Sequence, residues 1–125
     1  MRPRLLTAAD AAALLGKEMR CASREYLRIA HLDRHGGVLA LSSQSGGHHA
    51  LPIALQHIAR EAILHDSRRL LIAHNHPSGD PTPSMADRTV TRRLAEAMRL
   101  IGVELVDHLV FARRGVTSFR QIGLL

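Results

Sequence analysis

The sequence contains little cysteine and few aromatic residues, and it has no long hydrophobic run. Cys21 is the only cysteine among 125 residues, which excludes a disulfide framework and a cysteine-based zinc site. Tryptophan is absent and the aromatic residues are Tyr26, Phe111 and Phe119, so we expect a core of Leu, Ile, Val and Ala. No apolar run approaches the roughly 20 residues of a membrane-spanning helix. Because the first residues also lack a clean signal-peptide pattern, we expect a cytoplasmic protein with no membrane partner.

Lysine is nearly absent as well, although the chain is basic. The formal net charge is +6, and Lys17 is the only lysine among many arginines. A basic balance permits an acidic partner such as a nucleic acid. The arginines are spread along the chain, however, so we interpret most of them as solvated faces, and no motif supports nucleic-acid binding. The sequence does not indicate an oligomeric state.

The hydrophobic pattern alternates between strand-like and helix-like segments along the whole chain. Apolar residues recur at three- and four-residue spacing in two long segments, and shorter apolar runs bounded by turn residues indicate strands. This order predicts an α/β fold in which a mixed β-sheet is flanked by helices, in one domain over residues 1–125 with a short helical extension at about 1–20. Helices are predicted at residues 8–19, 52–65 and 85–101, and strands at 24–33, 38–41, 70–73, 103–112 and 116–119.

The segment from His74 to Asp87 carries the clearest chemical pattern. An apolar strand ends at a His-x-His pair, a loop with three prolines follows, and Asp87 lies at the start of the next predicted helix. Because side chains alternate along a strand, His74 and His76 are expected to point to the same side. Two histidines and one carboxylate, with a fourth position left to water, form the pattern of a catalytic zinc site.

A structural interpretation of the same segment also stays open. Ser84-Met85-Ala86-Asp87 matches a capping box, with Ser84 as N-cap and Asp87 as the third helical residue. The two interpretations are compatible, because a carboxylate in the first turn of a helix is electrostatically stable and suits a fixed ligand. The consecutive string His-Asn-His does not match the nuclease motif of that name, whose residues are spread over a hairpin and a helix.

These residues resemble a known family. His74-x-His76-Pro77 followed by Ser84-x-x-Asp87 is similar to the JAMM motif of MPN (JAB) domain metalloproteases. The resemblance covers about residues 24–125 and is strongest with the RadC branch. The further strings that carry it are Ala73-His74-Asn75-His76-Pro77-Ser78-Gly79-Asp80-Pro81, Thr91-Arg92-Arg93-Leu94, Asp107-His108-Leu109-Val110, Ser118-Phe119 and Gly123-Leu124-Leu125. It implies an MPN fold with cytidine-deaminase-like layering, and a Zn²⁺ ion held by His74, His76, Asp87 and a water molecule.

The resemblance also implies catalytic roles. It predicts a zinc-dependent hydrolase that cleaves a peptide or isopeptide bond in a peptide or protein substrate, with Ser84 donating a hydrogen bond to the developing oxyanion. The family needs a glutamate on an early strand as general base, and Glu25 beside Tyr26 matches that place. A surface carboxylate on an edge strand is the alternative interpretation of Glu25. Glu18 and Glu61 are rivals, but both fall in helical patterns.

Some features leave alternatives open. Asp107 and His108 either form a second layer around the zinc or are a polar pair at a strand end. The loop from Ser42 to His49 departs from the family pattern, so the substrate is not implied. A DNA-repair-associated protein that binds nucleic acid and a metal-binding scaffold without turnover are the alternative functions, and the intact ligand and base residues favour the hydrolase. Other histidines, namely His31, His35, His57 and His65, have no partner at ligand spacing and are predicted to be surface or satisfied core residues.

Overall fold

The structure is a computed structural model that describes residues 3–45 and 51–125, with the backbone alone for residues 51–54. Among these residues, no helix is long and apolar enough to cross a bilayer. The helices are α1 (Ala8–Cys21), α2 (Leu51–Leu64) and α3 (Met85–Leu100), and the strands are β1 (Tyr26–Leu32), β2 (Val38–Ser45), β3 (Arg69–Asn75), β4 (Glu104–Ala112) and β5 (Gly115–Ser118).

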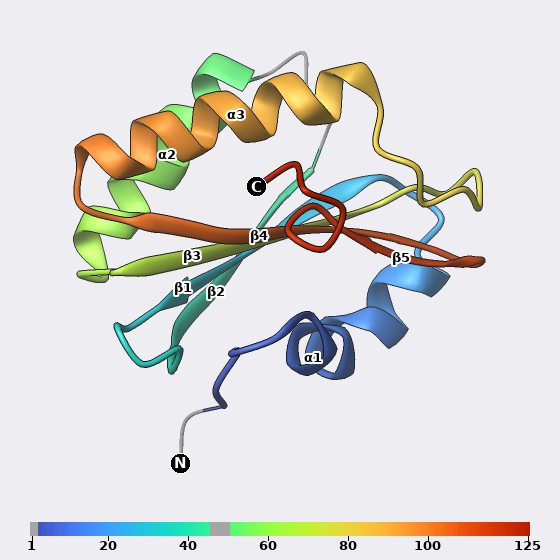
Figure 1. The fold of residues 1–125 in the computed structure, drawn as a ribbon, viewed down its shortest axis with the longest axis horizontal. Helices are drawn as coiled ribbons and strands as arrows, with labels where there is room; N and C mark the ends of the chain where they lie inside the picture. Colours follow the sequence, from blue (N-terminus) through green and yellow to red (C-terminus); the bar gives the residue numbers. More distant parts are fainter. Residues whose placement is uncertain (1–2, 46–50) are drawn as a thin grey trace.

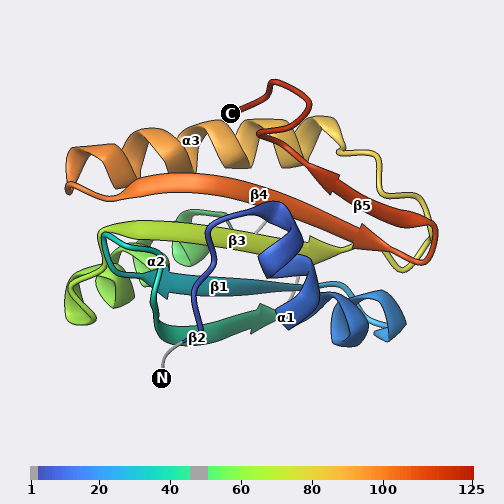
Figure 2. The same ribbon diagram turned by 60° about the horizontal axis from the view of Figure 1, so that its bottom comes forward.

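The strands form one mixed sheet, which confirms the predicted α/β class. Its order is β2-β1-β3-β4-β5; β3 and β4 are parallel, and the other neighbours are antiparallel. Helices α2 and α3 cover one face of the sheet and α1 covers the other (Figure 1). Turning the molecule brings α1 in front of the central strands (Figure 2). The parallel pair is connected through α3, so the loop that follows β3 leads directly into the first turn of that helix.

Two apolar layers hold the helices to the sheet. The layer on the α1 face joins Leu15 and Met19 to sheet residues such as Phe111, and the layer on the other face joins Leu94 and Met98 of α3 to Ile72. All six side chains are at most 2 % exposed. The core is mainly aliphatic, as the composition predicts, with methionine and Phe111 filling the remaining space.

Strand β2 is longer than the sequence analysis predicts. A loop was expected from Ser42, but the ladder with β1 continues to the pair Tyr26↔Ser45. The prediction was wrong because β2 is an edge strand, where serine and glutamine can alternate between a covered and a solvent-facing side. The rest of that predicted loop, residues 46–49, lies outside the described residues.

The start of β1 is also corrected. Glu25 was expected within a strand at residues 24–33, whereas β1 begins at Tyr26 and Glu25 immediately precedes it. The edge position assumed in the alternative interpretation is wrong, because β1 lies between β2 and β3 inside the sheet, although Glu25 is exposed as that interpretation expects. The pair Leu27↔His74 is the first between β1 and β3, so Glu25 lies just beyond the end of that ladder, beside the His-x-His segment.

Candidate metal centre

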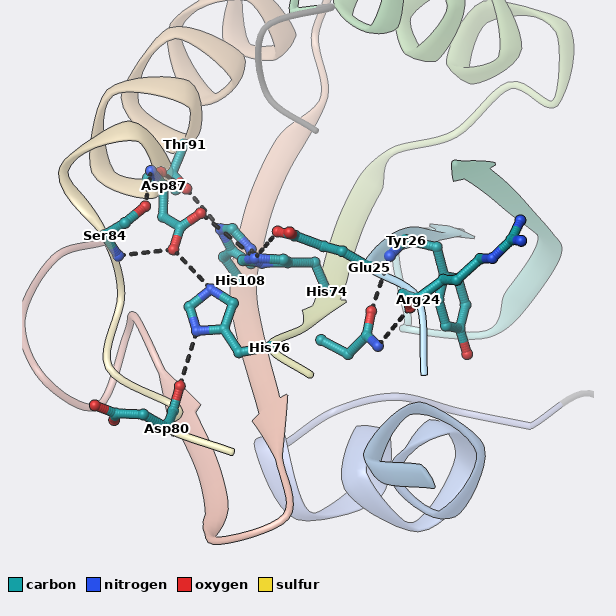
Figure 3. Close-up of polar contacts among 11 residues, drawn as sticks. Arg24, Glu25, Tyr26, His74, His76, Asp80, Ser84, Asp87, Thr91 and His108 are labelled. Carbon is teal, nitrogen blue, oxygen red and sulfur yellow. Dashed lines mark hydrogen bonds and ion pairs between the residues drawn. The ribbon is translucent and has the colours of Figure 1, made fainter. Parts of the chain in front are cut away.

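The predicted ligand residues meet where β3 ends. His74 lies in β3 and His76 follows it, and their ring centroids are 4.6 Å apart at an edge-to-face angle of 77°. Glu25 approaches from the segment just before β1 and Asp87 from the first turn of α3 (Figure 3). Strand alternation, the crossover through α3 and the β1–β3 register therefore bring four side chains from three segments to one place.

The nitrogen and oxygen atoms of these side chains lie close together. His74 Nε2 is 3.1 Å from Glu25 Oε1 and 3.4 Å from Asp87 Oδ1. His76 Nε2 is 3.2 Å from Asp87 Oδ2. Glu25, His74 and His76 each offer a ligand atom, and these atoms lie within 4.8 Å of one another, a possible metal-binding cluster. His74 and Asp87 are 1 % exposed, whereas the Glu25 side chain is 42 % exposed.

The loop after β3 fixes the orientation of the His76 ring. His76 Nδ1 lies 2.9 Å from the backbone oxygen of Asp80. A carbonyl oxygen only accepts hydrogen bonds, so Nδ1 carries the proton and Nε2 of the neutral ring presents a lone pair. The carboxylate of Asp80 accepts bonds from the hydroxyl and backbone N–H of Thr82, which lower the pKa of Asp80 and brace the loop. Gly79 supplies the tight turn with a φ of +99°.

A chain of three hydrogen bonds fixes the His74 ring in the same way. The hydroxyl of Thr91 donates to the backbone oxygen of Asp87 over 2.6 Å, so it accepts from His108 Nδ1, also 2.6 Å away. His108 Nε2 then bears a lone pair and accepts from His74 Nδ1 at 3.1 Å. In the neutral ring, the lone pair of His74 then lies on Nε2, the atom that faces Glu25 and Asp87.

Asp87 has a second contact that holds it in place. Its Oδ2 accepts a 2.7 Å hydrogen bond from the backbone N–H of Ser84, while the Ser84 hydroxyl accepts one of 3.0 Å from the backbone N–H of Asp87. The capping box is therefore present at the start of α3, and the same carboxylate faces both histidines. Accepting this bond leaves the hydroxyl proton of Ser84 available for donation.

The donor set fits a bound cation. Two imidazole lone pairs and two carboxylate groups are all hydrogen-bond acceptors, and acceptors converge favourably only around a positive charge. Ligand bonds of about 2.0–2.1 Å in a tetrahedron place neighbouring ligand atoms about 3.3 Å apart. The distances of 3.1–3.4 Å around His74 and His76 match that spacing.

The other candidate residues fall in different places. His108 contacts His74, whereas the Asp107 carboxylate binds the Ser118 hydroxyl at 2.5 Å and the backbone N–H groups of His108 and Arg120, and so ties β4 to the C-terminal segment. The rival Glu18 binds the side chains of Tyr26 and Arg28 at 3.0 and 2.8 Å.

The sequence analysis predicts no role for Asn75, and it does not place Thr91 in the site. Thr91 lies four residues after Asp87, so a shared helix face could have indicated it. Nothing in the sequence pattern distinguishes Asn75.

Comparison with known proteins gives a consistent result. A family model described as a RadC-like JAB domain matches residues 5–124, which confirms the resemblance found in the sequence. UPF0758 proteins are 42 % identical in Symbiobacterium thermophilum, 38 % in Desulfitobacterium hafniense and 37 % in Syntrophomonas wolfei, over 89 %, 100 % and 87 % of this chain. The matches cover 48 %, 56 % and 47 % of those relatives, so the chain spans about half their length.

Proposed function

Since the chain belongs to the RadC-like JAB domain family, we propose that its histidine–carboxylate centre binds one Zn²⁺ ion and hydrolyses an amide bond, peptide or isopeptide, in a peptide or protein substrate. The observation that carries this proposal is the pair of Nε2 lone pairs, each fixed by a partner on Nδ1 and each facing a carboxylate. Two imidazoles with a carboxylate suit zinc, whereas magnesium and calcium prefer sites made of oxygen atoms alone.

The two carboxylates are suited to different tasks. Asp87 is 1 % exposed and is held by the backbone of Ser84, as a permanent ligand should be. Glu25 has a longer side chain that is 42 % exposed, and its Oε1 lies 3.1 Å from His74 Nε2. A group at the border between the centre and solvent can exchange protons with both, so we assign His74, His76 and Asp87 as ligands and Glu25 as general base.

The roles of the chain's own residues follow from this assignment. A zinc ion bound here would lower the pKa of a coordinated water to about 7 and polarise the substrate carbonyl. Glu25 would accept the proton of the attacking water on its carboxylate and return it to the departing amine. Ser84 would donate its hydroxyl proton to the oxygen on which negative charge develops.

The proposal is tested by metal analysis. Protein purified without chelator should contain about one zinc per chain, and His76→Ala should abolish that content because a fixed donor is lost. His57→Ala, which removes a histidine at the other end of the sheet, should retain the zinc. Wild-type protein that is free of zinc, or that binds it equally well after His76→Ala, would contradict the proposal.

The role of Glu25 needs a separate variant. Glu25→Gln keeps the size of the side chain but removes the proton acceptor, so it should retain zinc and lose hydrolysis of a panel of peptide and isopeptide-linked substrates. A Glu25→Gln enzyme with wild-type turnover would place the general base elsewhere.

A further inference from the structure

The general base proposed above lies where the regular sheet no longer supports it. Glu25 precedes β1, and the β1–β3 ladder begins only at Leu27↔His74. No ladder hydrogen bond between β1 and β3 therefore fixes the backbone around Glu25. A long side chain on such a segment would sample many positions relative to His74.

The side chain of Asn75 takes the place of the missing ladder. Its Oδ1 accepts a 2.9 Å hydrogen bond from the backbone N–H of Tyr26, and its Nδ2 donates one of 2.8 Å to the backbone oxygen of Arg24. These two backbone groups flank Glu25. Asn75 is 1 % exposed, and its amide lies 49 and 51 residues away from these partners in sequence.

The two hydrogen bonds restrict the conformation of Glu25. In an extended chain, the C=O of one residue and the N–H two residues later point to the same side, as in a regular ladder. A single amide can bind both groups because the residue between them is extended. Glu25 then shares the sheet face of Leu27, which is also the face of its ladder partner His74, and this directs the carboxylate toward the His74 ring.

Asn75 also lies between the two histidines. Its backbone pairs with Phe111 of β4, and the N–H of His76 donates to the oxygen of Phe111 over 2.8 Å. The tripeptide His74–His76 thus presents two ring nitrogens to the centre while its middle residue holds the segment that carries Glu25. The amide orientation is determined, because the N–H of Tyr26 requires the oxygen and the C=O of Arg24 requires the NH₂.

We propose that Asn75 is a positioning residue that holds the Glu25 carboxylate against the histidine ligands. This proposal rests on the proposed function, since it assigns the residue through which Glu25 acts. Asn75→Leu keeps the branched shape of the side chain and removes both hydrogen bonds without adding charge. Asn75→Ala serves as the second variant, because the space that it leaves lets water reach Arg24 and Tyr26 if the leucine variant does not fold.

The first test is a double-mutant cycle on metal affinity. Metal-free wild type, Asn75→Leu, Glu25→Gln and the double variant are titrated with Co²⁺ in competition with a chromophoric chelator. We expect Asn75→Leu to weaken Co²⁺ binding about three- to tenfold when Glu25 is present and less than about twofold in the Glu25→Gln background. Ser67→Ala, which removes a buried hydroxyl far from the centre, should leave the affinity unchanged.

The cycle distinguishes positioning from a general loss of structure. Equal weakening in both backgrounds would mean that Asn75 supports the histidines or the fold instead of Glu25, and no weakening would also overturn the proposal. Hydrogen exchange of the Tyr26 amide gives a readout that needs no metal. We expect exchange to rise about tenfold or more in Asn75→Leu, with the amide of Ile29 unchanged. If wild type binds no Co²⁺, the metal function fails, and an unchanged Tyr26 exchange rate would then overturn the positioning role independently.

Discussion

Two histidine–carboxylate clusters lie at opposite ends of the same sheet face. The metal cluster surrounds the end of β3, and a far-end cluster surrounds the end of β1, where His31 pairs with the first part of β3. Both belong to the face that α2 and α3 cover. The metal cluster consists of Glu25, His74, His76 and Asp87, and the far-end cluster consists of His31, His57, Glu61 and Ser67.

The distances between rings and carboxylates in the two clusters partly overlap. In the far-end cluster, His57 Nε2 lies 2.8 Å from Glu61 Oε1, which is a hydrogen-bond distance between residues one helical turn apart. The other carboxylate oxygen lies 3.4 Å from His31 Nε2. Glu61 thus bridges the two rings through different oxygens, as Asp87 does for His74 and His76 in the metal cluster. The metal cluster adds a further carboxylate, and the ligand atoms of Glu25, His74 and His76 all lie within 4.8 Å of one another.

The two clusters differ in the partner of the second ring nitrogen, Nδ1. In the metal cluster, a backbone oxygen and the His108–Thr91 chain fix the proton on Nδ1 of His76 and His74. In the far-end cluster, His31 Nδ1 faces the Ser67 hydroxyl at 3.1 Å, which can donate or accept and so leaves the tautomer undetermined. Histidines near carboxylates are therefore not sufficient for a metal site; the partner on the opposite nitrogen decides which atom can bind.

The largest effect is expected from removing the Asp87 carboxylate, with removal of the Glu61 carboxylate as the comparison. Asp87→Ala should abolish zinc binding and lower kcat/KM by about 1,000-fold, about 4 kcal/mol, because the chemistry that the ion supplies is lost. Glu61→Ala, the equivalent change in the far-end cluster, should keep about one zinc per chain. Metal content and turnover are measured on both proteins. Zinc retained in Asp87→Ala would remove Asp87 from the ligand set.

The next effect compares two helix caps of the same design. Thr7 of α1 and Ser84 of α3 each form a capping box, with Asp10 and Asp87 respectively. Replacing either N-cap residue, Thr7 or Ser84, with alanine should lower the free energy of unfolding by about 1 kcal/mol. Only Ser84→Ala should also lower kcat, by about 100-fold, because only Ser84 is proposed to donate to the oxyanion. Denaturant unfolding measures the capping effect, and turnover measures the catalytic effect. Equal turnover in the two variants would mean that Ser84 acts only as a helix cap.

A smaller effect is expected from the hydrogen-bond chain behind His74. Thr91→Val keeps the shape of the side chain but removes the acceptor for His108, so the tautomer of His74 is no longer fixed. Zinc affinity should fall about tenfold. Ser67→Ala makes a comparable change behind His31 and should leave the affinity unaltered. Competition with a chelator measures both, and an unchanged affinity in Thr91→Val would show that the chain does not control His74.

The smallest effect concerns pH and the far-end cluster. Burial lowers the pKa of His31, against the opposing charge of Glu61, with His65 and His57 lowering it further. The unfolded chain, with a histidine pKa of about 6.5, therefore takes up the proton first as the pH falls, and stability falls below about pH 6.5. His31→Leu should flatten this dependence. Unfolding of metal-free protein between about pH 7.5 and 5.5 gives the comparison, and parallel curves would exclude His31 as the cause.

Most of the fold could be predicted from local patterns. The helix starts at Thr7 and Ser84 follow from capping sequences, and α3 ends before Gly102, whose φ is +79°. The extension of β2 through Ser42 could not be predicted, because polar residues become a strand only when a neighbour supplies the ladder. Local sequence shows the propensity of a segment, whereas edge or central position depends on the whole sheet.

The sequence by itself determined the spacing of His74, His76 and Asp87, since strand alternation and a helix start bring such residues together over a short distance. Only the tertiary structure decided which other groups meet them. Glu25 reaches His74 through the register of β1 against β3, and Asn75 binds on both sides of Glu25 across about fifty residues of sequence. The same register and the packing of α2 built the far-end cluster from His31 and Glu61. Hydrogen bonds to a particular nitrogen are set by three-dimensional contacts, and no periodicity in the chain encodes them.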